Sequence, residues 1–412
     1  MGKILRLEEV PLDEPLPDSL YDCDGVLLMR RGTIMTNAKL KALALKGLRY
    51  LELGAPADAP QSEPAAVATL EAPTTLPPEP WQHAAEEEAS LELPLPPSGR
   101  IRPIDPETTQ RVDQLVARAS ATVEELGKSL ADGTLRDATP IRNIASEFLK
   151  EIQGDADQTI AATMRQIADQ QLAMRSVQLS VLSIAITRAM KMTDAEQATV
   201  GSAAMLHDMA LFELPEHERF SRATMRPESR RIYESHPAIA YDMLERVRDI
   251  DGTVRIIVLQ AHEQADGSGF PRRITITRTH RLARVVNLAD AYLTLVGCGP
   301  DGQRILPADA IAYLMHQSCL GRFDSAATCG LVRAVSLYPV GSLVMLSDER
   351  KARVVRVADR SPVSPVVTLM DTDTPTPLID LSETEITVSR PIDEEEFGRR
   401  RLPASDLDKI LW

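Results

Sequence analysis

The chain has 412 residues, of which 43% are hydrophobic, and a formal net charge of -14 at pH 7. This length and apolar content predict a globular protein of two or three domains with a real core. The negative charge and an aromatic content of only 4% argue against nucleic-acid binding, because phosphate backbones are repelled and stacking platforms are scarce.

The first 55 residues predict a small α/β module. YDCDGVLLMRRGTIM at 21–35 has the pattern of two short strands around polar turns, and NAKLKALALKGLRYLEL at 37–53 has a helical pattern. The starting stretch MGKILRLEEV lacks the apolar core of a signal peptide, and the best apolar run, LSVLSIAI, is too short to cross a bilayer. The four cysteines form no CxxC pair, which is typical of reduced thiols. We therefore expect a cytoplasmic protein without a membrane span.

Residues 56–106 predict a disordered linker. They contain twelve of the 29 prolines, a cluster of glutamates at 86–88 and no lysine. Such a composition cannot bury enough apolar surface to offset the entropy of ordering the chain. A new domain is therefore expected to begin after residue 106.

Residues 107–337 predict a helical domain. Apolar residues recur at helical spacing over 112–130, 141–152, 160–174 and 177–190. From 338 to 395 the pattern changes to short β-branched runs, GSLVML, ARVVRVA and SPVVTLM, followed by a tail at 396–412. The expected fold is mainly α, a helical bundle flanked by the N-terminal α/β module and a small C-terminal β domain.

Polar residues interrupt the apolar helices at three places. His207 and Asp208 lie in GSAAMLHDMALF, and Asp290 lies in RLARVVNLADAYLTLV. Burying a carboxylate there is costly unless it is paired or binds a metal. Each has an ordinary alternative, a capped or ion-paired helix end for the first two and backbone hydrogen bonding for Asp290. His236, before Pro237, has the alternative role of a helix cap.

The stretch AHEQADGSGF at 261–270 adds another histidine and a turn. Asp266 and its glycines are explained as a surface turn, because glycine reaches positive φ at little cost and aspartate bonds its own backbone. That interpretation leaves His262 and Glu263 unexplained.

Together, the HD pair, the HP pair, HE followed by DGSGFP, and the acid of LAD resemble the HD-GYP family in type and order. These are helical, metal-dependent phosphodiesterases that hydrolyse cyclic di-GMP. The resemblance covers roughly residues 140 to 340 and implies an HD-type bundle. YPVGSLVMLSDERKARVVRVADRSPVSPVV is similar to the small β extension that often follows the domain.

The resemblance implies a role for each interrupting residue. His207 and Asp208, the implied catalytic pair, would hold a first metal with Asp290, while Asp208 bridges to a second metal on His236 and His262. The implied cofactor is a divalent transition metal, iron or manganese. Metal pairs activate water and neutralise phosphate oxygens, and imidazole and carboxylate suit such ions.

The turn would form the lip of the substrate cleft and a contact surface for other signalling proteins. The implied ligand is cyclic di-GMP or a related nucleotide. The lip comprises Asp266, Gly267, Ser268, Gly269, Phe270 and Pro271, with Phe270 where the family has tyrosine.

Several positions depart from the family pattern. Arg175 replaces the first metal histidine, and Ala261 replaces one histidine of a pair. Leu211, Gly299 and Gly302 replace basic phosphate contacts, for which Arg304 is a nearby partial substitute. One metal or none per chain is therefore expected, and Arg175 is expected to hold a ligand carboxylate such as Asp208.

Three functions stay open at this point. The first is a cyclic di-GMP phosphodiesterase of weak or no activity. The second is a non-catalytic module that binds nucleotides or proteins in signalling. A hydrolase of another nucleotide is the third, because the HD pair is widespread, and DGSGFP argues against it.

Overall fold

The computed structural model describes residues 104–164, 171–214, 227–297, 305–358, 361–370 and 378–392, with short stretches of the first 53 residues. The chain divides into two compact units, Met1–Pro96 and Pro97–Trp412. Each unit is described by itself.

The first unit contains a four-stranded antiparallel sheet of β1 (Lys3–Arg6), β2 (Leu20–Tyr21), β3 (Leu27–Met29) and β4 (Tyr50–Leu53), in the order β1-β4-β2-β3. The predicted helix at 37–53 is wrong at its end, because β4 pairs there with β1 and β2. Pairing with neighbouring strands outweighs the local helix propensity of residues 50–53. Residues 37–49 lie outside the described residues.

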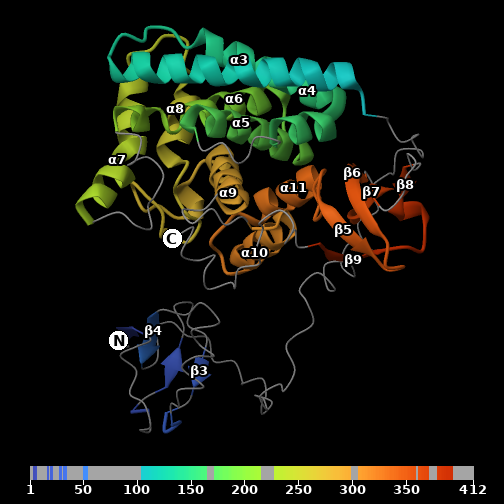
Figure 1. The fold of residues 1–412 in the computed structure, drawn as a ribbon. Helices are drawn as coiled ribbons and strands as arrows, with labels where there is room; N and C mark the ends of the chain where they lie inside the picture. The colour runs from blue at the N-terminus through green and yellow to red at the C-terminus, as the bar shows by residue number, and fades with distance from the viewer. Residues whose placement is uncertain are drawn as a thin grey trace. The chain divides into compact units, whose positions relative to one another are not determined.

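The second unit is mainly helical, as predicted (Figure 1). Its first helix, α3 (Pro106–Ala131), begins inside the expected linker, with Pro106 in the first turn and the Asp105 side chain as cap. Residues 56–103 lie outside the described residues, so the linker stays a prediction. In the part of the chain that the structure describes, no helix is both long and apolar enough to cross a membrane.

Five helices build the layers above and around the site. α4 (Thr139–Met164) lies beside α3, and α5 (Leu172–Ala189) and α6 (Asp194–Leu206) lie beneath them (Figure 1). The expected helix at 160–174 is wrong, because 160–164 belongs to α4 and 172–174 to α5. α5 buries almost every side chain from Leu172 to Thr187 and is the centre of the core. α9 (Arg281–Val296) packs against α5.

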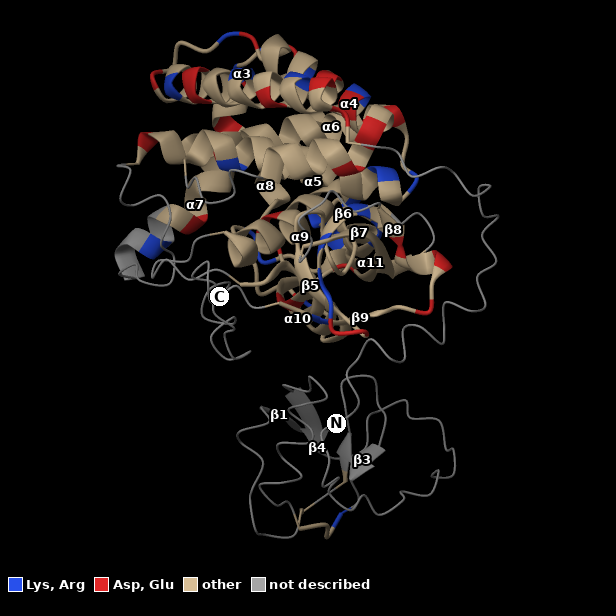
Figure 2. Ribbon diagram, turned by 45° about the vertical axis from the view of Figure 1, so that its right-hand side comes forward, with Lys and Arg blue, Asp and Glu red and all other residues tan. Residues whose placement is uncertain are grey.

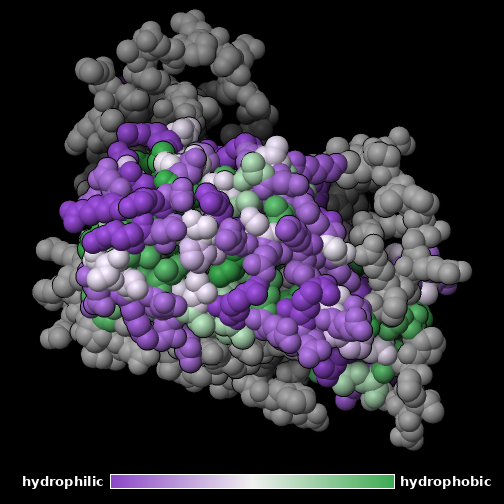
Figure 3. Space-filling view, turned by 90° about the horizontal axis from the view of Figure 1, so that it is seen from above, coloured by the Kyte–Doolittle hydropathy of each residue, from purple (hydrophilic) through white to green (hydrophobic). Residues whose placement is uncertain are grey.

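The remaining helices complete the domain. They are α7 (Pro227–Leu244), α8 (Gly252–Gln260), α10 (Pro307–Cys319) and α11 (Ser325–Val335), with short 3-10 helices η3 (Met209–Glu213) and η6 (Ile276–Arg278). Acidic and basic residues are interspersed along α3 and α4 (Figure 2), and Arg111 of α3 forms an ion pair with Glu151 of α4. Seen from above, this face is mostly hydrophilic (Figure 3).

A five-stranded antiparallel sheet follows the helices, as the β-branched runs predict. Its strands are β5 (Leu343–Leu346), β6 (Lys351–Ala358), β7 (Ser361–Leu369), β8 (Ile379–Asp380) and β9 (Val388–Pro391), in the order β8-β7-β6-β5-β9; residues 381–383 form the short helix η7. Arg356 of β6 pairs with Asp155 at 2.6 Å, where α4 has an extended, non-helical residue. This partly buried pair joins the sheet to the kink of α4.

Candidate metal centre

Five helices or their ends bring the predicted site residues together. α6 ends at Leu206, so that His207 and Asp208 lie at the turn into η3. His236 comes from α7, His262 from the turn after α8, and Asp290 from α9. The apolar residues of these helices pack together in one core. The polar site residues on the same helices are buried or half-buried with them.

Three imidazoles surround the carboxylate of Asp208. The Nε2 atom of His207 lies 3.1 Å from Asp208 Oδ2, and the Nε2 atoms of His236 and His262 lie 3.0 and 3.3 Å from Oδ1. The Nε2 atoms of His236 and His262 are 3.1 Å apart. All four residues are at most 8% exposed. The cluster therefore has the atom types and spacing of a metal site.

Hydrogen bonds to the backbone fix which ring nitrogen faces the centre. His207 Nδ1 lies 2.8 Å from the Ala204 carbonyl, and His236 Nδ1 lies 2.6 Å from the Tyr233 carbonyl. A carbonyl can only accept, so each Nδ1 carries a proton and donates it, and the Nε2 atom of each ring faces the centre. This is the tautomer that a metal-binding histidine needs.

A cation at the centre would satisfy the polar atoms of this cluster. His207 Nε2 is buried and makes no hydrogen bond within the described part of the chain, although it lies 3.1 Å from Asp208 Oδ2. The facing Nε2 atoms of His236 and His262 repel one another unless a proton or a metal lies between them. The donor atoms of His207, Asp208 and His262 all lie within 4.8 Å of one another. One metal ion fits these residues.

Charge interactions hold Asp208 ionised. Burial alone would raise the pKa of its carboxyl, but His207 outweighs burial and brings the pKa of Asp208 well below its usual value. Burial likewise opposes the charged form of His207, and the Asp208 carboxylate raises the pKa of that ring. Burial lowers the pKa of His262, which favours the neutral ligand form.

A guanidinium holds the remaining carboxylate. Arg175 Nη2 on α5 lies 2.6 Å from Asp290 Oδ1, 3.2 Å from the Asp290 carbonyl and 2.5 Å from Thr294 Oγ1. Arg175 does hold a carboxylate, but the expected partner Asp208 is wrong. Asp290 and Thr294 lie one turn apart on α9 and present two oxygens toward α5, whereas Asp208 is surrounded by histidines.

The Arg175–Asp290 pair changes the implied first metal position. Burial would raise the pKa of Asp290, but the guanidinium brings it below its usual value. Asp290 Oδ2 lies 3.8 Å from His262 Nδ1, so Asp290 stays beside the cluster while its other oxygen is used by Arg175. The residues here do not fit a second metal ion.

Two further departures lie in the core. Leu211 in η3 is 1% exposed, and Ala261 at the end of α8 is fully buried. Apolar side chains therefore fill the places where the resemblance implies a lysine and a histidine. Gly299, Gly302 and Arg304 lie outside the described residues.

The glycine-rich turn has an exposed tip and a buried end. Asp266 Oδ1 accepts hydrogen bonds from the backbone N–H and the hydroxyl of Ser268, at 2.8 and 2.6 Å, and both residues are exposed. Phe270, expected on the lip, is only 5% exposed and stacks on His262, with ring centroids 4.9 Å apart and 7° between the planes. Phe270 is thus a wall of the cluster.

Glu263 fastens this turn. Its carboxylate accepts hydrogen bonds from the backbone N–H groups of Arg272, at 2.7 Å, and Ile274, at 3.1 Å. Burial raises the pKa of Glu263, against the effect of these donors. The sequence marks Glu263 only as an unexplained buried acid; its role is to hold the chain that follows His262.

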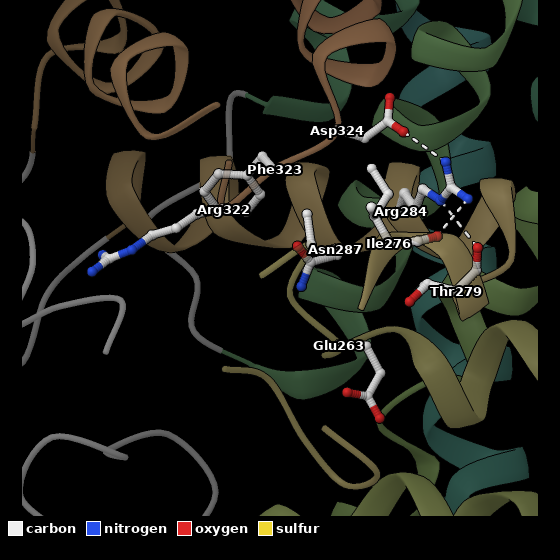
Figure 4. Close-up of a pocket in the computed structure, with 9 residues that line it drawn as sticks. Glu263, Ile276, Thr279, Arg284, Asn287, Arg322, Phe323 and Asp324 are labelled. Carbon is white, nitrogen blue, oxygen red and sulfur yellow. Dashed lines mark hydrogen bonds and ion pairs between the residues drawn. The ribbon is translucent and has the colours of Figure 1, made fainter. Parts of the chain in front are cut away.

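A small cavity is lined by Glu263, Arg284, Asn287, Phe323 and Asp324, among others, and by no histidine (Figure 4). Arg284 donates to Asp324 at 2.9 Å, to the Thr279 carbonyl at 3.0 Å and to the Ile276 carbonyl at 2.7 Å. Because its donors join residues 276–279 to the start of α11, Arg284 is part of the support of the chain that follows the turn.

Gly269→Ala is expected to destabilise the protein by about 1 to 3 kcal/mol and to weaken metal binding. An added Cβ would lie 2.2 Å from Gln264 N and 2.4 Å from the His262 carbonyl, both of them backbone atoms. The turn would have to move, and Phe270 with it. Thermal unfolding and metal content measure both effects.

Gly154→Ala is the matched control, because nothing lies within 4 Å of a Cβ added there. If Gly269→Ala unfolds at the same temperature as the parent, the close approach at residue 269 does not hold the turn.

Comparison with known proteins places the site inside a recognised domain. Residues 161–327 match a family model described as an HD domain. The cyclic di-GMP phosphodiesterase PA4108 of Pseudomonas aeruginosa is 25% identical over 253 residues, which cover 61% of this chain and 61% of that protein. The cyclic di-GMP phosphodiesterase PdeB of Borreliella burgdorferi is 20% identical over 194 residues, 47% of this chain and 51% of that protein.

Among solved structures, Bd1817, an HDG"Y"P protein from Bdellovibrio bacteriovorus, is 20% identical with a TM-score of 0.45 and covers 80% of this chain and 98% of its own. The chain spans less than two thirds of the length of the two curated relatives. The matched range 161–327 contains every residue of the cluster and Arg175.

Proposed function

Because the chain is an HD-GYP domain protein, we propose that it acts in cyclic di-GMP signalling with a centre that holds one metal ion and has weak phosphodiesterase activity or none. The observation that supports this most directly is the guanidinium of Arg175 on Asp290. It supplies one positive charge at the place where the resemblance implies a metal-binding imidazole.

A single metal ion fits the residues that remain. His207, Asp208, His236 and His262 would hold it, since Asp208 supplies the anionic oxygen and two rings already present Nε2 inward. Iron or manganese suits this mixture of imidazole and carboxylate. When bound, such an ion supplies Lewis acidity and positive charge. Phe270 covers one face of His262 and shields that ligand from water.

Weak activity follows from what a guanidinium lacks. In two-metal phosphodiester hydrolysis, one cation serves the attacking oxygen and the other the leaving oxygen. Arg175 can stabilise negative charge and donate hydrogen bonds, but it cannot activate water as a Lewis acid. The test is an assay of purified, metal-reconstituted protein with cyclic di-GMP, in which turnover comparable to that of a two-metal relative would contradict the proposal.

The second candidate is a non-catalytic module that binds a nucleotide or a protein partner. The exposed tip of the turn, with Asp266 and Ser268 held by the anchored chain after Glu263, favours a contact surface. The two candidates differ in Asp208→Ala: any hydrolysis by the parent would disappear in that variant, whereas binding through the tip of the turn would persist.

Cyclic di-GMP is expected to bind weakly. Leu211 is buried and apolar, and Gly299 and Gly302 stand where the resemblance implies basic contacts. Each lost charge-assisted hydrogen bond to phosphate removes roughly 1.5 to 3 kcal/mol. Calorimetric titration with Leu211→Lys measures the effect, with Gln110→Lys at an exposed position of α3 as control for added charge. Tight binding by the parent would contradict this expectation.

A further inference from the structure

We propose that Arg175 is an oxyanion contact of the ligand-binding site, so that a phosphate group bound at the metal also receives hydrogen bonds from this guanidinium. The inference rests on the proposed metal at His207, Asp208, His236 and His262. It gives Arg175 a binding role beyond its ion pair with Asp290.

The guanidinium has hydrogen-bond donors left over. Its contacts with Asp290 and Thr294 are all made by Nη2. A guanidinium carries five N–H groups, so Nη1 and Nε still have donors, and neither atom makes a hydrogen bond within the described ranges. Neither is among the buried polar atoms that lack a partner. These N–H groups are therefore in contact with solvent and can bind an anion.

Arg175 and Asp290 are the most exposed side chains of this group. Its side chain is 22% exposed and that of Asp290 is 19% exposed, whereas the side chains of the three histidines and Asp208 are at most 9% exposed. The guanidinium is thus the cationic group of the site that solvent, and an anion dissolved in it, can reach.

The charges of the site make anion binding depend on the metal. Leaving the imidazoles aside, the carboxylates of Asp208 and Asp290 outweigh Arg175 by one negative charge, which disfavours a phosphate. A divalent ion on the histidines reverses the sign to one positive charge, and phosphate is attracted. Arg175 and the metal then act on the same anion from neighbouring positions.

The orientation of the guanidinium is already fixed. Asp290 and Thr294 hold Nη2 from one side of α9, so little side-chain freedom is lost when an anion binds to the other N–H groups. A lysine at this position would keep the charge but could not hold both α9 oxygens and a phosphate in the same geometry.

The test is calorimetric binding of inorganic phosphate to the full chain reconstituted with manganese. Parent protein is expected to bind phosphate only when metal is loaded. Arg175→Gln should weaken phosphate binding at least tenfold at unchanged metal content, and Arg175→Lys should weaken it less. Asp290→Asn should strengthen it severalfold, because the guanidinium loses its competing carboxylate. A role confined to structure predicts no such increase.

Arg188→Gln is the matched control, because Arg188 lies on the same helix and binds the Ile152 carbonyl, about 20 Å along α5 from Arg175. Loaded Arg175→Gln that binds phosphate as tightly as the parent would overturn the inference alone. A parent that loads no metal would overturn the proposed function and the inference together. Should Arg175→Gln not fold, an Asp290→Asn variant with unchanged or weaker phosphate affinity overturns the inference instead.

A second arm uses cyclic di-GMP in place of phosphate. The same dependence on Arg175 identifies a nucleotide phosphate as the bound group. Dependence with inorganic phosphate alone shows that the site takes free phosphate and contradicts a nucleotide ligand at this position.

Discussion

Asp208→Asn is expected to weaken metal binding by more than about 100-fold, since losing even a supporting residue of a metal site costs 10- to 100-fold. Asp208 contributes the only carboxylate that contacts all three imidazoles within the described residues. An asparagine fills the same space, but it lacks the negative charge that offsets the charge of the ion. Metal content after reconstitution and dialysis measures the effect.

Asp266→Asn serves as the control for this variant, because Asp266 is an exposed carboxylate at the tip of the turn and, within the described ranges, bonds only to Ser268. It should retain the metal content of the parent. Asp208→Asn that keeps its metal would show that the ion, if bound, lies elsewhere than between the histidines.

Restoring three groups at once is expected to create a two-metal enzyme. Arg175→His would release Asp290 and place an imidazole on α5 opposite α9, while Ala261→His and Leu211→Lys would add a second ligand and a phosphate contact. Each single change should do little, because an in-line displacement needs both cations, and groups that act as a unit are not additive. Hydrolysis of cyclic di-GMP and metal content measure the result.

Two of these substitutions are also expected to lower the stability of the fold. Ala261 is fully buried and Leu211 is 1% exposed, so larger or charged side chains there will destabilise the fold by about 1 to 3 kcal/mol. A triple variant that loads two metals without hydrolysis would point to the glycines at 299 and 302. One that folds but gains no metal would refute the alignment of Arg175 and Ala261 with ligand positions.

The gathering of the cluster could be predicted from sequence. His207, Asp208, His236, His262 and Asp290 span 84 residues, yet their order and type resemble one family closely enough to place them together, and the structure does so. The β-branched runs after residue 338 likewise predict the C-terminal sheet, and in β5 the alternation of the run matches the alternation of burial.

Other features depend on side-chain placement that no pattern encodes. Arg175 pairs with Asp290 because Thr294, one turn further along α9, accepts a second hydrogen bond from the same guanidinium. No spacing in the sequence predicts that α5 packs against this side of α9. Phe270 reads as part of a surface turn, but its backbone N–H donates to the His262 carbonyl at 3.1 Å, which folds the ring inward. The end of the predicted helix at 37–53 becomes β4 for a similar reason, its long-range pairing with β1.

The most direct test of a one-metal centre is the metal content of the purified, reconstituted chain. Elemental mass spectrometry, together with the protein concentration, gives the number of metal ions per chain. The Arg175–Asp290 pair predicts at most one tightly bound transition metal per chain in the parent. Two or more equivalents per chain would contradict it, because Asp290 would then have to leave the guanidinium and serve as a ligand.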